Sequence, residues 1–465
     1  MSTEAQIETS RAEPAPRATL RPLLLRLHFY AGVLVGPFLL VAALTGLLYV
    51  FAPNLEQVLY DHELHVPAAA ESVPLAQQVA AAEAALPGST LAAVRPAPSP
   101  TDTTQVIFDS PGLAESYRHT VFVNPHDGEI RGVLETYGSG QALPVRAWLD
   151  ELHRSLHLGD VGRLYSELAA SWLWVVVLGG LVLWWSRRRR TRLRPDRTAS
   201  GRRRTLSWHG ATGTWAALVL LFLSATGLTW SQFAGANVGS LRAALSWETP
   251  AVSSSLGAHA EHGAVGHDAA GHGHGDSTVI GPDEVLAAAR EAGLDDPVEI
   301  RPPAAEGDAY VVQQVQRHWP EKQDQAAVDP VTGEVLEVLR FDDWPLMAKL
   351  ARWGIDAHMG LLFGLPNQLV LAAVCLALTA LVVLGYRMWW QRRPTRAGFG
   401  LGRPYSRGGW RRVPLWLLAP LVAVAAAVAW FLPLLGVSLA GFLVLDALGS
   451  LRAPRARPAA TTGAE

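Results

Sequence analysis

Four histidines in this 465-residue sequence lie at or near the ends of long apolar stretches. His28 and His209 each begin such a stretch, whereas His153 and His358 each come shortly before one. A neutral imidazole can bind transition-metal ions, and two imidazoles from facing helices can hold one haem iron between them. A lone histidine at a membrane boundary can instead be an interfacial side chain, held by water or a backbone carbonyl.

The spacing of these histidines pairs them. Five residues recur 181 positions later: His28, Gly32, Thr45, Gly46 and Leu47 return as His209, Gly213, Thr226, Gly227 and Leu228. Others recur 205 positions later, among them Trp148, His153 and Gly159, which return as Trp353, His358 and Gly364. We interpret this as an internal twofold repeat, which places His28 level with His209 and His153 level with His358. His157 is a secondary candidate, because its counterpart is Leu362.

Small residues accompany the first pair. Gly32 and Gly213 follow His28 and His209 by one helical turn and therefore share their faces. The missing side chains would leave room for a flat macrocycle beside the imidazoles. Close helix packing is the alternative use of such glycines.

The elements that must position the histidines are membrane helices. Hydrophobic residues make up 49% of the chain, and a span needs roughly 20 of them in succession. Four segments qualify: 23–51, 168–186, 209–230 and 367–390. A further apolar region, 414–448, is interrupted by Pro433 and predicts a hairpin of two more spans. The predicted fold is thus a membrane α-helical bundle of four core spans plus a C-terminal hairpin.

Arginines indicate the orientation of these spans. The connections 187–208 and 391–413 are rich in arginine and are expected in the cytoplasm, together with both termini, 1–22 and 449–465. A nucleic-acid-binding role for these runs is disfavoured because both adjoin apolar spans, so no nucleic-acid partner is expected. The loops 52–167 and 231–366 then lie outside, and the first span stays as an anchor. The single cysteine, Cys375, excludes an intramolecular disulfide.

Each outer loop has the pattern of a small α+β domain. Amphipathic segments such as "VPLAQQVAAAEAAL" are followed by strand, turn and strand around "NPHDG" and "DPVTG". The second loop also contains an insert, 253–276, that has no counterpart in the first. Its five histidines can bind a divalent metal ion, or the insert can be a spacer: His259, His262, His267, His272 and His274.

These motifs resemble the PepSY-associated transmembrane proteins. The resemblance rests on "LH" and "TG" in the first and third spans, on "LHRSL" and "GYRMWWQRRP" at the second and fourth, and on the two hairpins. It implies two PepSY-like extracytoplasmic domains and a place in a bacterial inner membrane. Family members resemble iron-uptake proteins, some of them haem-containing reductases of ferric siderophores.

Combined with the histidine pairs, the resemblance predicts two b-type haems, at His28/His209 and His153/His358. The absence of "CxxCH" excludes covalent attachment. No nucleotide-binding glycine motif is present, so electrons are expected from a membrane quinol or another membrane donor. The expected activity is that of an oxidoreductase, a transmembrane ferric reductase acting on a ferric siderophore or chelate. The two histidine levels would be roughly 20–25 Å apart at about 1.5 Å per helical residue.

Two other functions fit parts of this sequence. The histidine-rich insert is also typical of an extracytoplasmic metal-binding sensor or transport-accessory protein. The outer loops alone are consistent with a PepSY binding or peptidase-regulating module. Only the reductase must contain haem.

Overall fold

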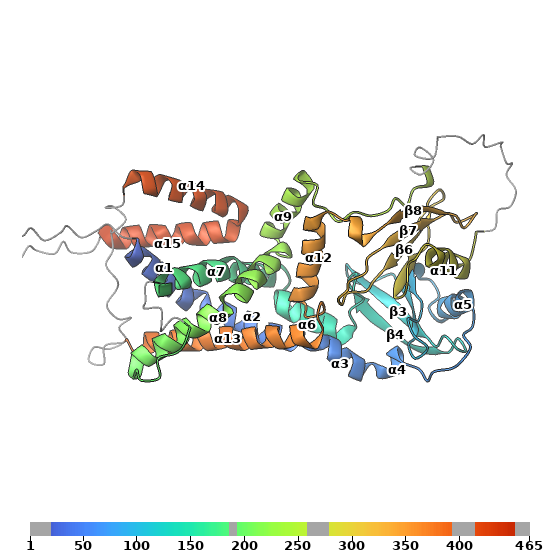
Figure 1. Ribbon diagram of the computed structural model, residues 1–465, viewed down its shortest axis with the longest axis horizontal. Helices are drawn as coiled ribbons and strands as arrows, with labels where there is room; N and C mark the ends of the chain where they lie inside the picture. The colour runs from blue at the N-terminus through green and yellow to red at the C-terminus, as the bar shows by residue number, and fades with distance from the viewer. Residues whose placement is uncertain (1–19, 186–192, 258–278, 393–413, 452–465) are drawn as a thin grey trace, which may run out of the picture. The chain divides into compact units, whose positions relative to one another are not determined.

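The computed structural model describes residues 20–185, 193–257, 279–392 and 414–451 (Figure 1). Contacts within the chain divide it into two compact units. The first comprises 1–39, 168–224 and 380–465, and the second comprises 40–167 and 225–379. His28 and His209 belong to the first unit, whereas His153 and His358 belong to the second.

Long apolar helices account for the predicted core spans. By length and composition, three described helices can cross a membrane: α7 (Gly159–Trp185), α8 (Gly201–Thr229) and α13 (Leu365–Trp390). Helices α1 (Arg21–Leu34) and α2 (Gly36–Val50) would together make a fourth span, bent by 55° at their break. These helices agree with the predicted membrane helical fold, although α7 and α8 begin well before the predicted positions 168 and 209.

The break between α1 and α2 follows from Pro37. A proline removes a backbone N–H and displaces the carbonyl four residues earlier, which here belongs to Val33. The Tyr386 hydroxyl of α13 donates a hydrogen bond to this carbonyl oxygen at 2.6 Å. A Cβ atom on Gly36 would lie 3.4 Å from the Tyr386 ring, so the glycine allows the tyrosine to approach. The bend therefore leaves no unpaired carbonyl at Val33.

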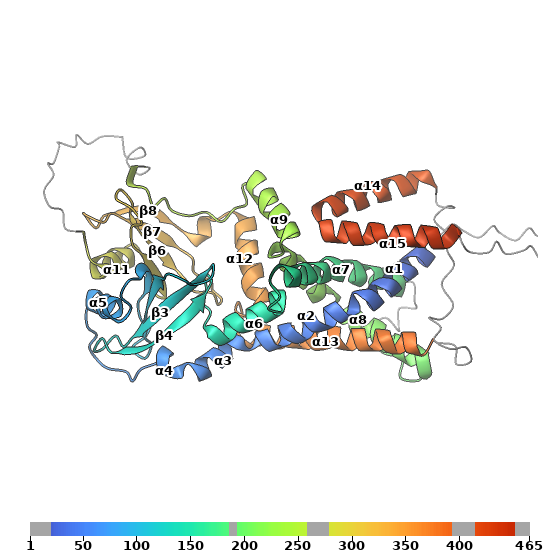
Figure 2. The ribbon, with the colours of Figure 1, turned by 180° about the vertical axis from the view of Figure 1, so that it is seen from behind.

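The C-terminal apolar region forms two helices, α14 (Leu415–Phe431) and α15 (Pro433–Leu451), which turn back on each other at Leu432 (Figure 2). The proline at the start of α15 explains the turn, because it has no backbone N–H to extend the hydrogen bonding of α14 and favours the first turn of a new helix. Both helices are apolar but shorter than the three long helices. The predicted hairpin is present, and its double crossing of the membrane stays a prediction.

The loops between the spans build one antiparallel sheet of eight strands, in the order β4-β3-β2-β1-β5-β6-β7-β8. The first loop supplies β1 (Thr90–Arg95), β2 (Thr104–Asp109), β3 (Tyr117–Val123) and β4 (Ile130–Tyr137). The second loop supplies β5 (Val298–Arg301), β6 (Tyr310–Gln314), β7 (Gln325–Val328) and β8 (Val335–Leu339). Strands β1 and β5 join the two sets, with Val94 opposite Ile300. The two predicted α+β domains thus share a single sheet.

Two helices cover one face of this sheet, α5 (Leu75–Ala85) and α11 (Pro282–Glu291). Alternate strand residues such as Val94, Phe108 and Ile300 point into the core between the sheet and these helices. The carboxylate of Asp283 in α11 accepts hydrogen bonds from the first backbone N–H groups of α5, at 2.7 and 2.8 Å. The two loops therefore form one hydrophobic core.

Short helices connect the sheet to the spans. Two of them carry the second histidine pair: His153 lies on α6 (Pro144–Ser155) and His358 ends α12 (Leu346–His358). Both helices come directly before a long apolar helix, α7 or α13, as the sequence predicts. The other connecting elements are α3 (Ala52–Leu59), α4 (Asp61–Leu64), α9 (Phe233–Ala244) and the 3₁₀ turn η2 (Phe341–Asp343).

Candidate haem-binding histidine pairs

The structure brings His28 of α1 and His209 of α8 together. Their ring centres are 6.4 Å apart and their planes are inclined by 82°. Metal–imidazole bonds are about 2.0–2.1 Å long and a ring nitrogen lies about 1.2 Å from its ring centre, so two imidazoles on opposite sides of one ion have centres roughly 6.4 Å apart. The separation is compatible with both imidazoles binding one metal ion.

Backbone carbonyls define the tautomer of this first pair. His28 Nδ1 lies 3.1 Å from the carbonyl oxygen of Val176 in α7, and His209 Nδ1 lies 3.1 Å from that of Leu381 in α13. A carbonyl only accepts hydrogen bonds, so each neutral ring carries its proton on Nδ1 and a lone pair on Nε2. Metal-binding histidines usually have this arrangement, because the second nitrogen orients the ring.

The second pair uses threonine in place of carbonyls. Nδ1 of His153 lies 2.9 Å from Oγ1 of Thr45, and Nδ1 of His358 lies 2.6 Å from Oγ1 of Thr226. The Thr45 hydroxyl donates to the carbonyl of Val41 at 2.9 Å and so accepts the bond from His153. Nε2 of His153 is therefore the unprotonated nitrogen, as in the first pair.

Desolvation keeps the second pair neutral. It lowers the pKa of His153 to about 4 and that of His358 to about 3, where the neighbouring His153 adds to the effect. Both rings are therefore neutral near pH 7. Neutral imidazole is the form that binds a metal ion.

Glycines shape the space beside the histidines. A Cβ on Gly46 would lie 3.1 Å from Cε1 of His153, and one on Gly180 would lie 3.0 Å from Cε1 of His28. Glycine at these positions lets the rings approach the helix backbones. The glycines predicted to make room for a macrocycle differ: a Cβ on Gly32 would meet nothing within 4 Å, whereas one on Gly213 would lie 3.5 Å from Leu381.

His157, the secondary candidate, has other partners. Its Nδ1 lies 3.4 Å from the Glu151 carboxylate, and its ring stacks on Trp148 with centres 4.8 Å apart. His358, in contrast, packs edge-on against Trp230 at 5.4 Å. His259, His262, His267, His272 and His274 lie outside the described residues. Within the described ranges, no group of three or more His, Cys, Asp or Glu side chains is arranged to hold a metal ion.

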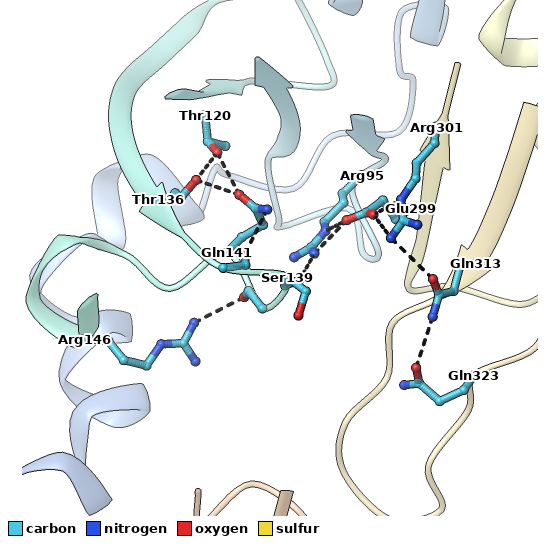
Figure 3. A network of polar contacts seen from close by, with 12 residues as sticks. Arg95, Thr120, Thr136, Ser139, Gln141, Arg146, Glu299, Arg301, Gln313 and Gln323 are labelled. Atoms are coloured by element: carbon cyan, nitrogen blue, oxygen red, sulfur yellow. Dashed lines mark hydrogen bonds and ion pairs between the residues drawn. The ribbon is translucent and has the colours of Figure 1, made fainter. Parts of the chain in front are cut away.

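The face of the sheet opposite α5 and α11 is polar where β1 meets β5 (Figure 3). The Glu299 carboxylate accepts hydrogen bonds from Arg95 and Arg301, each at 2.8 Å. Burial raises the pKa of Glu299, but the two arginines outweigh it and hold the pKa below its ordinary value. Beside this joint, the side chains of Thr120, Thr136 and Gln141 bond to one another. This face can offer charged and neutral hydrogen-bonding groups to a polar ligand.

Sequence reasoning missed the partners of the histidines. Thr45 and Thr226 are repeated residues, but nothing in the sequence assigns them a bond. A group of buried charges near His358 was also missed. Asp356, fully buried, accepts from Arg317 at 2.7 Å, and Arg352 bridges it to Glu321. The sequence offers one signal for this group: Arg352 and Asp356 are six and two positions before the candidate ligand His358.

The apolar helices and the sheet built from their connecting loops define a multi-pass membrane protein with a β-sheet domain. The family model described as "PepSY-associated TM region" matches residues 25–392. The chain therefore belongs to the PepSY-associated transmembrane family, as its sequence predicts. No curated protein matches the chain. Helices α14 and α15 lie beyond the matched residues.

Proposed function

We propose that the protein binds two b-type haems without covalent attachment and works as a transmembrane ferric reductase. The observation that carries this proposal is the His28/His209 pair, whose ring separation fits a shared iron and whose Nδ1 atoms are both held by carbonyls. Both rings of the His153/His358 pair also have a partner at Nδ1, with Thr45 and Thr226 as the orienting groups. A bound haem would supply one-electron redox chemistry at its iron.

The chain's own residues would bind the haem, orient the imidazole rings and shield the site from water. His28 and His209 offer Nε2 lone pairs, and the carbonyls of Val176 and Leu381 fix the ring orientation. The surrounding apolar helices exclude water, which favours neutral imidazole over imidazolium. Arg95 and Arg301, on the polar face of the sheet, are suited to contact a ferric chelate.

The proposed reaction balances with a quinol as donor. Oxidation of one quinol to quinone releases two electrons and two protons, and each electron reduces one ferric ion to ferrous. We assign the quinol to the cytoplasmic ends of the spans, an orientation that the arginine-rich connections favour. The sheet domain would then lie outside a bacterial inner membrane, where a ferric siderophore or chelate arrives, and both termini would be cytoplasmic.

The absorption spectrum of the purified protein, oxidised and then reduced with dithionite, tests this proposal. We expect b-type bands corresponding to two haems per chain. His28→Ala and His209→Ala should each remove one haem and leave the other. The matched control is His157→Ala, which should retain both because its ring has other partners. A colourless protein from haem-replete cells would overturn the proposal.

A further inference from the structure

Helix α15 packs against the spans along a single face. Ser438, Phe442 and Asp446 follow one another at intervals of four residues and therefore share that face. Ser438 accepts a hydrogen bond from Nε1 of Trp172 in α7 at 2.8 Å. The Phe442 ring lies 6.0 Å from that of Tyr30 in α1. Helix α15 thus contacts α1 and α7 from Ser438 to Asp446.

The third contact is a buried ion pair. Nε and Nη2 of Arg26 each donate to one oxygen of Asp446, both at 2.9 Å. Arg26 is 1% exposed and Asp446 is 7% exposed. Charged side chains among apolar helices are costly unless they are paired, and the two-pronged arginine–carboxylate geometry is the strongest form of pairing. Separating α15 from α1 would expose both charges to an apolar environment, so the pair resists separation.

Arg26 precedes His28 by two residues on α1. At 3.6 residues per turn, the two side chains point to nearly opposite sides of the helix. One side is held by Asp446, and the other presents His28 to Val176 and His209. Helix α1 has 14 residues and is bent by 55° from α2 at the break before Gly36.

We propose that α15, which lies outside the family match, is a positioning element for the His28/His209 site. Asp446 holds Arg26 and thereby fixes the rotation of α1 that aims His28 at its partner. The link to a haem rests on the proposed function, whereas the rotation of α1 is testable without it. Asp446 and Arg26 are positioning residues, since Arg26 points to the side of α1 opposite His28 and Asp446 acts through Arg26.

Cross-linking tests the rotation of α1 independently of haem. In a Cys375→Ser background, cysteines replace His28 and Gly180, whose positions are adjacent in the structure. We expect Asp446→Asn to slow oxidative cross-linking of this pair several-fold in membrane vesicles. Exchanging the charges, with Arg26→Asp and Asp446→Arg, should restore the rate. Asp109→Asn, which breaks an exposed ion pair, is the control and should have no effect.

Electron paramagnetic resonance then tests the consequence for the site in the otherwise unmodified chain. The spectrum of a low-spin ferric haem depends on the angle between its axial imidazole planes, so Asp446→Asn should shift one of two signals and the charge exchange should reverse the shift. Equal cross-linking with and without Asp446, or unshifted signals in Asp446→Asn, would overturn the positioning role. A wild-type chain without haem would overturn the proposed function alone, and the cross-linking rates would still decide the role of α15 in fixing α1.

Discussion

At the scale of single residues, all four candidate ligands have a partner at Nδ1, but the partners differ in kind. His28 and His209 use backbone carbonyls, which no substitution can remove. His153 and His358 use threonine hydroxyls, which can be replaced. Groups that orient a metal-binding histidine contribute strongly to affinity, and their loss typically weakens metal binding 10–100-fold.

The threonine bonds lead to a first prediction. Thr45→Val and Thr226→Val keep the side-chain shape but remove the hydroxyl that bonds to Nδ1, so each should weaken haem binding at the His153/His358 pair by about 10–100-fold. Thr45→Ser should bind as the wild type does. Haem titration of the apoprotein measures the effect, with Thr136→Val in the sheet as the control. Unchanged affinity in both valine variants would show that the hydroxyls are dispensable.

Glu56 leads to a second prediction, about pH. Its carboxylate accepts a hydrogen bond from the backbone N–H of Leu143 at 2.6 Å and pairs with Arg146 at 3.1 Å. Burial is the largest effect and raises its pKa from 4.5 to about 7, against the opposing influence of Arg146. The folded protein thus binds this proton more tightly than the unfolded chain. The contribution of Glu56 to stability is therefore full below about pH 4.5 and is lost as the pH rises through about 7.

Glu56→Gln should remove this dependence. Relative to the wild type, the variant should gain about 2–3 kcal/mol between pH 5 and pH 8, since one pKa unit corresponds to about 1.4 kcal/mol. Unfolding midpoints in detergent at the two pH values measure the difference. Glu129→Gln, at an exposed carboxylate, is the control. If the variant instead loses stability relative to the wild type as the pH rises, pairing with Arg146 outweighs burial in setting the pKa of Glu56.

The sequence predicts the histidines of the site but not their partners. His28 and His153 stand out because residues around them recur at constant intervals. The carbonyls of Val176 and Leu381 carry no such signal, because every residue has a carbonyl and only helix packing selects these two. A repeated threonine is visible in the sequence, but its bond depends on the distance between two helices.

At the scale of elements, local patterns predict the spans well and their details less well. Apolar length identifies α7, α8 and α13. The bend between α1 and α2 had a signal in Pro37, but its stabilisation by Tyr386 depends on tertiary packing. The sequence contains no signal for the pairing of β1 with β5, because strand patterns do not show which strand edges will pair. For this reason the sequence indicates two domains where the structure has one sheet.

The histidine-rich insert gives a third prediction at this scale. Deleting residues 258–276 should leave folding and haem content unchanged, because the segment 253–257, which bonds to Glu337, Gly307 and Ala309 of the sheet domain, is kept. The deletion should weaken divalent metal binding by the purified protein, since five imidazoles are removed. Isothermal titration with Zn²⁺ and Cu²⁺ measures this effect. Replacing the five histidines by serine is the matched variant, because it keeps the length of the insert and removes only the imidazoles. Equal metal affinity in the wild type, the deletion and the serine variant would show that the insert is only a spacer.

At the scale of the whole molecule, the proposed function requires both histidine pairs to act in series across the membrane. The predicted separation of roughly 20–25 Å makes direct transfer from the first pair to an outer acceptor very slow. A fourth prediction follows for His358→Ala. It should still allow a quinol analogue to reduce the His28/His209 site, but it should abolish reduction of an external ferric chelate.

Sealed vesicles measure this outcome. Reductant is supplied on one side and ferric chelate on the other, and ferrous iron is followed with a coloured chelator. His157→Ala, in the same region but with other partners, is the control and should reduce iron at the wild-type rate. Wild-type rates in His358→Ala would show that this histidine is structural and that two sites in series are not needed.

The joint between β1 and β5 resembles an interface between two separate proteins. Residues up to Trp185 supply β1 to β4, His28 and His153, and residues from Leu193 onward supply β5 to β8, His209 and His358. A gene cut between these two residues would therefore encode two complementary fragments. Either fragment alone would have one imidazole for each site and an uncovered strand edge prone to aggregation. Produced together in one cell, the two fragments should reassemble. Haem absorption bands should then appear only when both fragments are present.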